Sequence, residues 1–105
     1  TRKALPPTIA YGAAKSGVNY LSLVLAQQLG PRGITVNALA PGLVETEMGD
    51  QVLGNPVMRQ HAADSTALGR VGTVEDIVGV AAFLVSDDAR WITGQTIHAS
   101  GGEYL

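Results

Sequence analysis

The sequence predicts an α/β fold with a parallel sheet, and three observations support this fold class. Segments with the helical spacing of apolar residues alternate with short apolar segments of strand character. Hydrophobic residues make up 46% of the 105 residues and charged residues only 15%, below the roughly 25% charge that is usual in soluble domains, so the chain is expected to fold and not to be disordered. Glycine and proline separate the segments. Strands that alternate with helices are typical of a parallel sheet with helical crossovers.

The first predicted helix covers residues 9–29. Its apolar stripe has steps of three and four and consists of Ala14, Val18, Leu21, Leu25 and Leu29. Other apolar residues lie outside the stripe, so we expect this helix to be buried on more than one side. Pro6 and Pro7 predict a loop before it, and Gly30-Pro31 predicts its end.

A buried strand is predicted at residues 34–40, which are mostly apolar and do not alternate with polar residues. Pro41-Gly42 is expected to end it. Residues 43–66 are predicted to form a long loop with a short helix near 50–62, and loops of this length often serve as lids or binding loops.

A second helix is predicted at residues 74–85. Thr73 has the character of an N-cap, and Glu75 and Asp76 lie in the first turn, where the helix dipole favours negative charge. A short strand follows at 96–99. Because two strands do not make a stable sheet alone, we expect this chain to be part of a larger fold.

The distribution of charge agrees with that expectation. Between Ala4 and Val44 the only charged residues are Lys15 and Arg32. A surface with so few charges predicts packing against further sequence or against another chain. The chain also begins with Thr1 and not with Met, so we expect a fragment of a longer chain. No signal-peptide pattern is visible at this start.

Several classes of function are excluded or disfavoured by composition. The chain has no cysteine, and His61 and His98 lack ligand spacing, so no metal site is expected. A net charge of −2 without a basic stripe argues against nucleic acid as a partner. No apolar run approaches the roughly 18 residues of a membrane span.

Tyr11 and Lys15 form a Y-x-x-x-K motif in the sequence YGAAK. On a helix these side chains lie one turn apart on one face. A nearby ammonium favours the phenolate, which a tyrosine needs to act as a general acid or base. A half-buried tyrosine beside an extended lysine would give the same motif without function. The absence of any other charge between Ala4 and Pro31 favours the functional interpretation.

The run YGAAKSGVNYLSLVLAQQLGPRGITVNALAPGLVETEM resembles the segment around the active-site tyrosine of short-chain dehydrogenases/reductases. Asn37-Ala38, Pro41-Gly42 and Thr46 follow in the order and spacing of that family. The run LGRVGTVEDIVGVAAFLVSDDARWITGQTIHASGG resembles its C-terminal helix and last strand. The resemblance covers residues from about 9 to 102.

The resemblance implies roles for six residues. Tyr11 would be the catalytic acid/base, and Lys15 would assist it and hold the hydroxyls of the nicotinamide ribose. Pro41, Gly42 and Val44 would line the nicotinamide. Backbone groups near Val44 and the hydroxyl of Thr46 would bond its carboxamide, and the loop at 43–66 would be a substrate lid.

For the whole protein the resemblance implies the C-terminal half of a doubly wound parallel-sheet NAD(P)-binding Rossmann fold, of the single-domain branch. The cofactor would be NAD or NADP and the substrate a small carbonyl or alcohol. We further expect a cytoplasmic homo-oligomer, a dimer or tetramer. The family's catalytic serine and glycine-rich turn would precede Thr1, so the isolated chain is expected to be inactive.

Two alternatives remain open at this point. The chain could be a non-catalytic remnant that uses its helices for association. It could also be another nucleotide-binding α/β protein with a chance Y-x-x-x-K, although the ordered P-G and G-G pairs disfavour this. A glycine-rich turn and a serine upstream of Thr1 would identify the enzyme.

Overall fold

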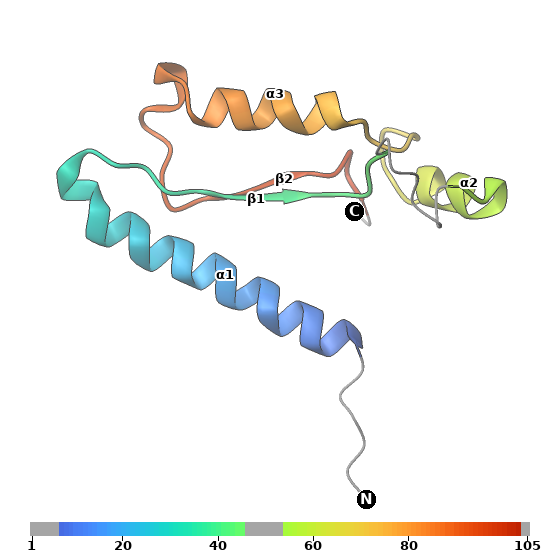
Figure 1. The fold of residues 1–105 in the computed structure, drawn as a ribbon, viewed down its shortest axis with the longest axis horizontal. Helices are drawn as coiled ribbons and strands as arrows, with labels where there is room; N and C mark the ends of the chain where they lie inside the picture. Colours follow the sequence, from blue (N-terminus) through green and yellow to red (C-terminus); the bar gives the residue numbers. More distant parts are fainter. Residues whose placement is uncertain (1–6, 46–53, 104–105) are drawn as a thin grey trace, which may run out of the picture. The chain divides into compact units, whose positions relative to one another are not determined.

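A computed structural model describes residues 7–45 and 54–103 (Figure 1). The helices are α1 (Pro7–Leu29), α2 (Pro56–Asp64) and α3 (Val74–Leu84), and the strands are β1 (Ala38–Pro41) and β2 (Thr96–Ala99). The chain divides into two compact units. Unit 1 comprises the described residues up to Ala38 together with Arg90–Thr96, and unit 2 comprises those of Leu39–Ala89 and from Ile97 onward.

Helix α1 begins two residues before the predicted start, and the prediction that Pro7 lies in a loop was wrong. Proline suits the first helical position, because its missing N–H would have no intrahelical partner there. The helix ends at Leu29, as the Gly30-Pro31 pair predicts. A short 3-10 turn follows, and the left-handed residue that closes it is Gly33, with a φ of 75°.

Strand β1 is shorter than the predicted strand at 34–40 and includes Pro41, which was expected to lie beyond its end. Its preceding residues bond to a turn instead of a strand. The Val36 N–H donates to the Thr93 hydroxyl at 3.0 Å, and the Val36 carbonyl accepts from the Gly94 N–H at 2.8 Å. Regular pairing begins only at Ala38, and this explains the late start of the strand.

Asn37 bonds the backbone of the same turn. Its side-chain N–H donates to the Ile92 carbonyl and its side-chain oxygen accepts from the Gln95 N–H, each at 3.1 Å. Both partners belong to unit 1. This one amide therefore ties the segment that enters β1 to the segment that enters β2.

The two strands pair in one sheet. The Ala38 N–H donates to the Gln95 carbonyl at 2.9 Å, and the Gly42 N–H donates to the Ala99 carbonyl at 3.0 Å. Because the residue numbers of both partners rise together, the strands are parallel. Helix α3 lies between them in the chain and forms the crossover that parallel strands require. The bounds of β2 coincide with the predicted strand at 96–99.

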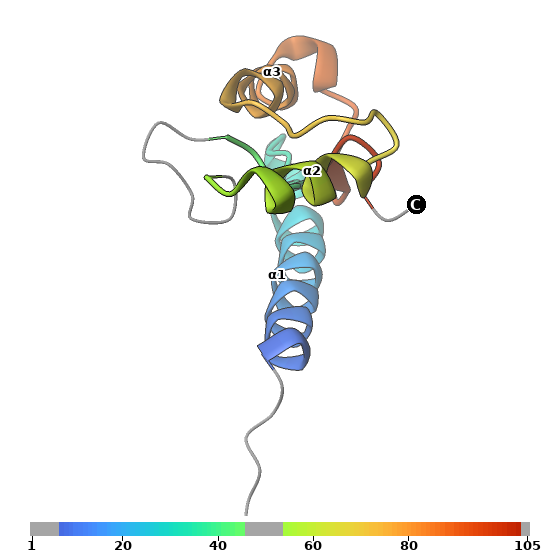
Figure 2. The ribbon, with the colours of Figure 1, turned by 90° about the vertical axis from the view of Figure 1, so that its right-hand side faces the viewer.

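The helices of unit 2 have well-defined N-termini. Asn55 caps α2 by accepting from the Val57 and Met58 N–H groups at 2.9 and 3.3 Å, so this helix begins later than the predicted 50–62. Residues 46–53 of the predicted lid lie outside the described residues. Thr73 is confirmed as the N-cap of α3. The connection between α2 and α3 is a loop that contains turns and bends (Figure 2).

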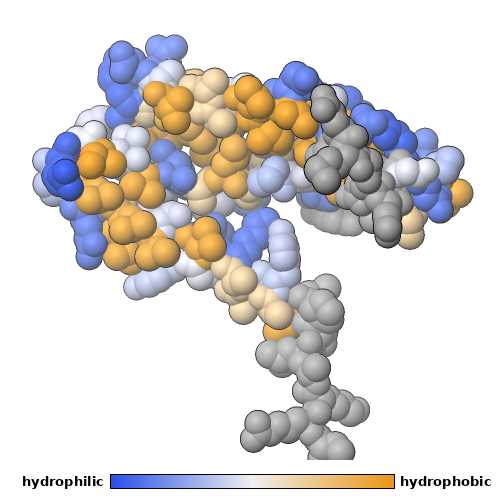
Figure 3. Space-filling model, viewed as in Figure 1, coloured by the Kyte–Doolittle hydropathy of each residue, from blue (hydrophilic) through white to orange (hydrophobic). Residues whose placement is uncertain are grey.

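Few residues are buried, and those that are buried have small side chains. In the described part of the chain the buried hydrophobic residues are Ala26, Ala40, Val71 and Ala89. Larger apolar side chains are exposed along α1 and along α3 (Figure 3). Val18 and Leu21 of α1 are 58% and 56% exposed, and Val78 of α3 is 57% exposed. Faces of this kind are typical of surfaces that contact other protein.

None of the helices within the described residues is both long enough and apolar enough to cross a membrane.

Candidate active site

Tyr11 and Lys15 project from α1 one turn apart, in unit 1. The Lys15 ammonium lies 5.8 Å from the centre of the Tyr11 ring, within the distance at which a cation is attracted to an aromatic face. Tyr11 is 66% exposed, so it is not the half-buried tyrosine of the non-functional interpretation. Lys15 forms no ion pair with any described residue. Both polar groups are therefore open to a ligand.

The Pro41-Gly42 pair lies at the end of β1, in unit 2. A Cβ atom at Gly42 would lie 2.9 Å from the Ser100 Cα and 3.0 Å from its Cβ. Side chains do not approach backbone so closely, and only glycine fits at this position. The Gly42 N–H also bonds the Ala99 carbonyl. The chain that leaves β1 is thus held against the end of β2.

Val44 pairs with Gly72 in an isolated parallel bridge. The Gly72 N–H donates to the Leu43 carbonyl at 3.2 Å, and the Glu45 N–H donates to the Gly72 carbonyl at 2.8 Å. A parallel bridge of this kind uses the backbone groups of the residues on either side of Val44. The N–H and carbonyl of Val44 itself take no part in the bridge, and they remain open to a ligand.

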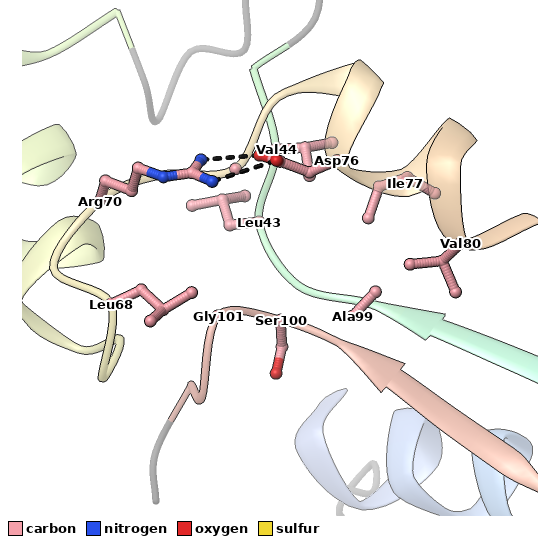
Figure 4. Close-up of a pocket in the computed structure, with 11 residues that line it drawn as sticks. Leu43, Val44, Leu68, Arg70, Asp76, Ile77, Val80, Ala99, Ser100 and Gly101 are labelled. Atoms are coloured by element: carbon pink, nitrogen blue, oxygen red, sulfur yellow. Dashed lines mark hydrogen bonds and ion pairs between the residues drawn. The ribbon is translucent and has the colours of Figure 1, made fainter.

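A pocket of about 180 Å³ lies beside this bridge in unit 2 (Figure 4). Its lining residues are Leu43, Val44, Leu68, Arg70, Gly72, Asp76, Ile77, Val80, Ala99, Ser100 and Gly101. Ile77 and Val80 point into it from α3 (Figure 4). Most of the lining residues are apolar, and the charged ones are Arg70 and Asp76. Among the predicted cofactor residues that the structure describes, Val44 alone lines it.

Arg70 and Asp76 form a two-pronged ion pair with distances of 2.7 and 3.1 Å. The same carboxylate accepts from the Thr73 N–H at 2.8 Å and from the Thr73 hydroxyl at 3.1 Å. The Arg70 guanidinium, followed by the Thr73 N–H, holds the pKa of Asp76 well below its usual range. This carboxylate is therefore ionised wherever the protein is folded near neutral pH.

A second ion pair joins α2 to the residue that follows Val44. The Arg59 guanidinium lies 2.6 Å from the Glu45 carboxylate, and both side chains are about half exposed. The hydrogen bond from Arg59 lowers the pKa of Glu45 from its ordinary value. The helix of the predicted lid is thereby linked to the predicted cofactor segment within unit 2.

The predicted site residues fall into two groups. Tyr11 and Lys15 belong to unit 1, and Pro41, Gly42 and Val44 belong to unit 2. Thr46 lies outside the described residues. Unit 1 offers a phenol and an ammonium that has no ion-pair partner among the described residues, and unit 2 offers an open backbone N–H beside an apolar pocket.

Sequence reasoning missed the Arg70 contact. The T-x-x-D spacing of Thr73 and Asp76 was visible as a helix start. The turn at Gly69, whose φ is 75°, brings the Arg70 side chain to Asp76. Without knowledge of this turn, the contact cannot be predicted. That turn is held by the Thr66 hydroxyl, which accepts from the Gly69 and Arg70 N–H groups at 3.0 and 3.2 Å. A threonine three residues before a glycine is too common a pattern to identify it.

No grouping of three His, Asp or Glu side chains suited to a metal ion occurs within residues 7–45 and 54–103. His61 and His98 are both exposed.

Comparison with protein families gives a match over residues 1–103 to the model described as enoyl-(acyl carrier protein) reductase. An uncharacterized oxidoreductase of Methylorubrum extorquens is 47% identical over 100 residues, which are 93% of this chain and 40% of the relative. A 3-oxoacyl-[acyl-carrier-protein] reductase of Rickettsia felis is 41% identical over 97 residues, which are 92% of this chain and 39% of the relative. The chain thus spans about 40% of the length of these relatives.

Solved structures give the same result. The reductase LugOII, which catalyses a keto-reduction in lugdunomycin biosynthesis, has a TM-score of 0.86 at 42% identity and covers the whole chain. The angucycline C-6 ketoreductase LanV, solved with bound NADP, has a TM-score of 0.84 at 40% identity. A 4-hydroxyisoleucine dehydrogenase complexed with NADH has a TM-score of 0.83 at 32% identity. This chain covers 41%, 40% and 41% of them, respectively. These likenesses confirm the α/β fold class.

Proposed function

The chain belongs to the short-chain dehydrogenase/reductase family, and we propose that the whole protein interconverts a carbonyl and an alcohol with NAD or NADP. The observation that carries the proposal is the pairing of Tyr11 and Lys15 on one face of α1, both open to a ligand. The family membership gives this pairing its chemical meaning, since a Y-x-x-x-K motif alone is common on helices.

Tyr11 acts as the proton donor and acceptor. In reduction its O–H donates a proton to the carbonyl oxygen of the substrate, and in oxidation the phenolate accepts the proton of the alcohol. When bound, a nicotinamide cofactor would supply the hydride that the carbon gains in reduction, or accept it in oxidation. The net change in the reduction direction is one hydride and one proton added across the C=O bond.

Lys15 supports Tyr11 by its charge. An ammonium one helical turn away stabilises the phenolate that forms when the proton leaves. Its N–H groups also donate to the hydroxyls of the nicotinamide ribose. The lack of an ion-pair partner among the described residues leaves these donors available for that purpose.

Unit 2 supplies the contacts to the nicotinamide end. The open N–H of Val44 would donate to the carboxamide, and the hydroxyl of Thr46 would add a second bond. Pro41 and Gly42 line the ring, and Gly42 keeps the turn tight because it has no side chain. Residues 43–66 form a lid that excludes water during hydride transfer.

The cofactor proposal covers both NAD and NADP, because similar structures hold NADP in one case and NADH in another. The substrate is a small carbonyl or alcohol. We also propose a cytoplasmic homo-oligomer, a dimer or tetramer, supported by the exposed apolar face of α1. Since the chain spans about 40% of its relatives, the isolated 105 residues are proposed to be inactive.

The test is Tyr11→Phe in the whole protein, with Tyr20→Phe as the matched control. Tyr20 lies on the same helix and is 70% exposed, so it loses the same hydroxyl from a similar environment. Tyr11→Phe should reduce turnover of a ketone panel by roughly 100-fold or more. NADPH and NADH affinities, measured by fluorescence titration, should stay within about twofold of the parent value. Tyr20→Phe should leave both quantities unchanged.

Two results would overturn the proposal. Turnover that survives Tyr11→Phe would remove the assigned acid/base role. A whole protein that binds neither NADPH nor NADH would favour the non-catalytic association module instead.

A further inference from the structure

We propose that Arg70 and Asp76 are positioning residues for the nicotinamide end of the cofactor, acting through Gly72 on the backbone of residues 43–45. Neither side chain is assigned contact with the cofactor. The inference rests on the proposed function, because it concerns the segment that carries the Val44 N–H. It is based on the position of the Arg70–Asp76 ion pair, which bonds the residues on both sides of Gly72. Gly72 in turn bonds residues 43–45.

Residues 43–45 are attached to Gly72. Beyond the end of β1, two backbone hydrogen bonds join this segment to Gly72, at 3.2 Å from the Gly72 N–H and 2.8 Å to its carbonyl. A Cβ at Gly72 would lie 2.9 Å from the Val44 Cγ1 and 3.4 Å from the Leu43 carbonyl oxygen, so the Gly72 backbone lies close against this segment. The direction of the Val44 N–H therefore follows the position of Gly72.

Gly72 itself is held through its two neighbours in the chain. The residue before it, Val71, has a carbonyl that accepts from the Arg70 guanidinium at 3.3 Å. The residue after it, Thr73, has an N–H that donates to the Asp76 carboxylate at 2.8 Å. The ion pair closes the arrangement at 2.7 and 3.1 Å (Figure 4). Gly72 is thus held from both sides by one pair of charged groups.

The Arg70–Asp76 pair contributes more to the geometry of this segment than to the stability of the fold. The Arg70 and Asp76 side chains are 55% and 38% exposed, and exposed ion pairs add little to global stability. The two-pronged geometry, however, fixes orientation as well as distance. A small displacement of a bonding group lowers cofactor affinity sharply, because hydrogen bonds weaken steeply away from ideal geometry. We therefore infer that the pair sets geometry more than stability.

The test compares Arg70→Met and Asp76→Asn in the whole protein with Glu75→Gln as the control. Glu75 is the neighbouring acid in the first turn of α3, and no described residue bonds its side chain. Its substitution removes a charge at the helix start without touching the pair. Arg70→Lys is the conservative variant, which keeps the charge but cannot form both prongs.

The first readout is hydrogen exchange of the Gly72 and Glu45 amides, which donate to the two sides of the bridge. In Arg70→Met their protection should fall by roughly tenfold or more. The Val85 amide, which bonds the Ala81 carbonyl at the other end of α3, should keep its protection. Arg70→Lys should give an intermediate loss, and it serves as the test if Arg70→Met does not fold.

The second readout is NADPH and NADH affinity by fluorescence titration. We expect Arg70→Met and Asp76→Asn to weaken binding by roughly tenfold each, and the double variant to be no weaker than the single variants. Glu75→Gln should stay within about twofold of the parent. The midpoint of thermal unfolding should change little in all of them.

The outcomes separate this inference from the proposed function. Unchanged protection at Gly72 and Glu45 overturns the positioning role, whatever the cofactor does. Equal loss of protection at Val85 also overturns it, because the pair would then act on the whole helix. Local loss of protection in a protein that binds neither NADPH nor NADH supports the positioning of residues 43–45 and overturns the proposed function.

Discussion

The two units differ in how they hold their candidate functional groups. In unit 1, Tyr11 and Lys15 lie on a regular helix, with the Lys15 ammonium 5.8 Å from the centre of the Tyr11 ring and Tyr11 two-thirds exposed. In unit 2, the groups around Val44 are fixed by a backbone bridge, a glycine without room for a side chain and two ion pairs. In unit 1 the helix determines the spacing of the two side chains, whereas in unit 2 the loops determine the direction of the backbone groups around Val44.

This difference has a physical origin. An α-helix satisfies its own backbone, so two side chains one turn apart need no outside support to share a face. A chain that leaves a strand has unpaired backbone groups and requires partners. Residues 43–45 find those partners at Gly72. Substitutions at the positions of unit 2 that hold residues 42–45 should therefore change structure, and substitutions of exposed residues on α1 should not.

The largest structural effect is expected from Gly42→Ala. The new Cβ would lie 2.9 Å from the Ser100 Cα, and because that neighbour is backbone, the end of the sheet must shift. Overpacking of this kind costs about 1–3 kcal/mol. Gly79→Ala is the control, since nothing lies within 4 Å of its Cβ position in α3. It should stabilise that helix by up to about 1 kcal/mol.

Urea unfolding of the whole protein measures both changes. A Gly42→Ala variant as stable as the parent would show that the P-G turn is looser than described. It would also remove the contrast between the two units, because unit 2 would then tolerate substitution as α1 does.

The sequence was sufficient where structure is local. The apolar stripe and the Gly30-Pro31 pair located the end of α1, and Thr73 located the start of α3. Both signals act within a few residues of the feature that they define. The Y-x-x-x-K pairing belongs to the same class, because helical geometry alone brings Tyr11 and Lys15 together.

The sequence was insufficient where distant segments compete for the same backbone. Residues 34–37 have strand character, yet Val36 and Asn37 bond a turn more than fifty residues away, so β1 starts late. The bridge between Val44 and Gly72 is another case. Neither residue carries a pattern that names its partner, because backbone pairing depends on tertiary structure and not on residue type.

A smaller effect is expected from Asn37→Ala in unit 1. The substitution removes the acceptor for the Gln95 N–H and the donor to the Ile92 carbonyl, both at 3.1 Å. Loss of a hydrogen bond that leaves a partner unsatisfied costs about 1–3 kcal/mol, and we expect the lower part of this range because the site is only half-buried. Asn19→Ala on α1 is the control, with no side-chain hydrogen bond to a described residue.

In urea unfolding, Asn37→Ala should lower the midpoint and Asn19→Ala should not. Equal stability of the two variants would show that the turn at 92–95 holds its position without Asn37. The segment before β1 would then resemble α1 in its independence from side-chain partners.

The smallest effect is expected from Arg59→Met, which removes the partner of Glu45. The Arg59 hydrogen bond lowers the pKa of Glu45, so Arg59→Met should return that pKa toward its ordinary value in an NMR titration. Because the folded-state pKa lies below the unfolded one, the pair stabilises the fold at neutral pH, and this contribution is lost as the pH falls through the folded value. The stability difference between parent and variant should therefore shrink in acid. A Glu45 pKa that does not change would show that α2 is not linked to residues 43–45. The orientation of the Val44 N–H would then depend on the bonds to Gly72 alone.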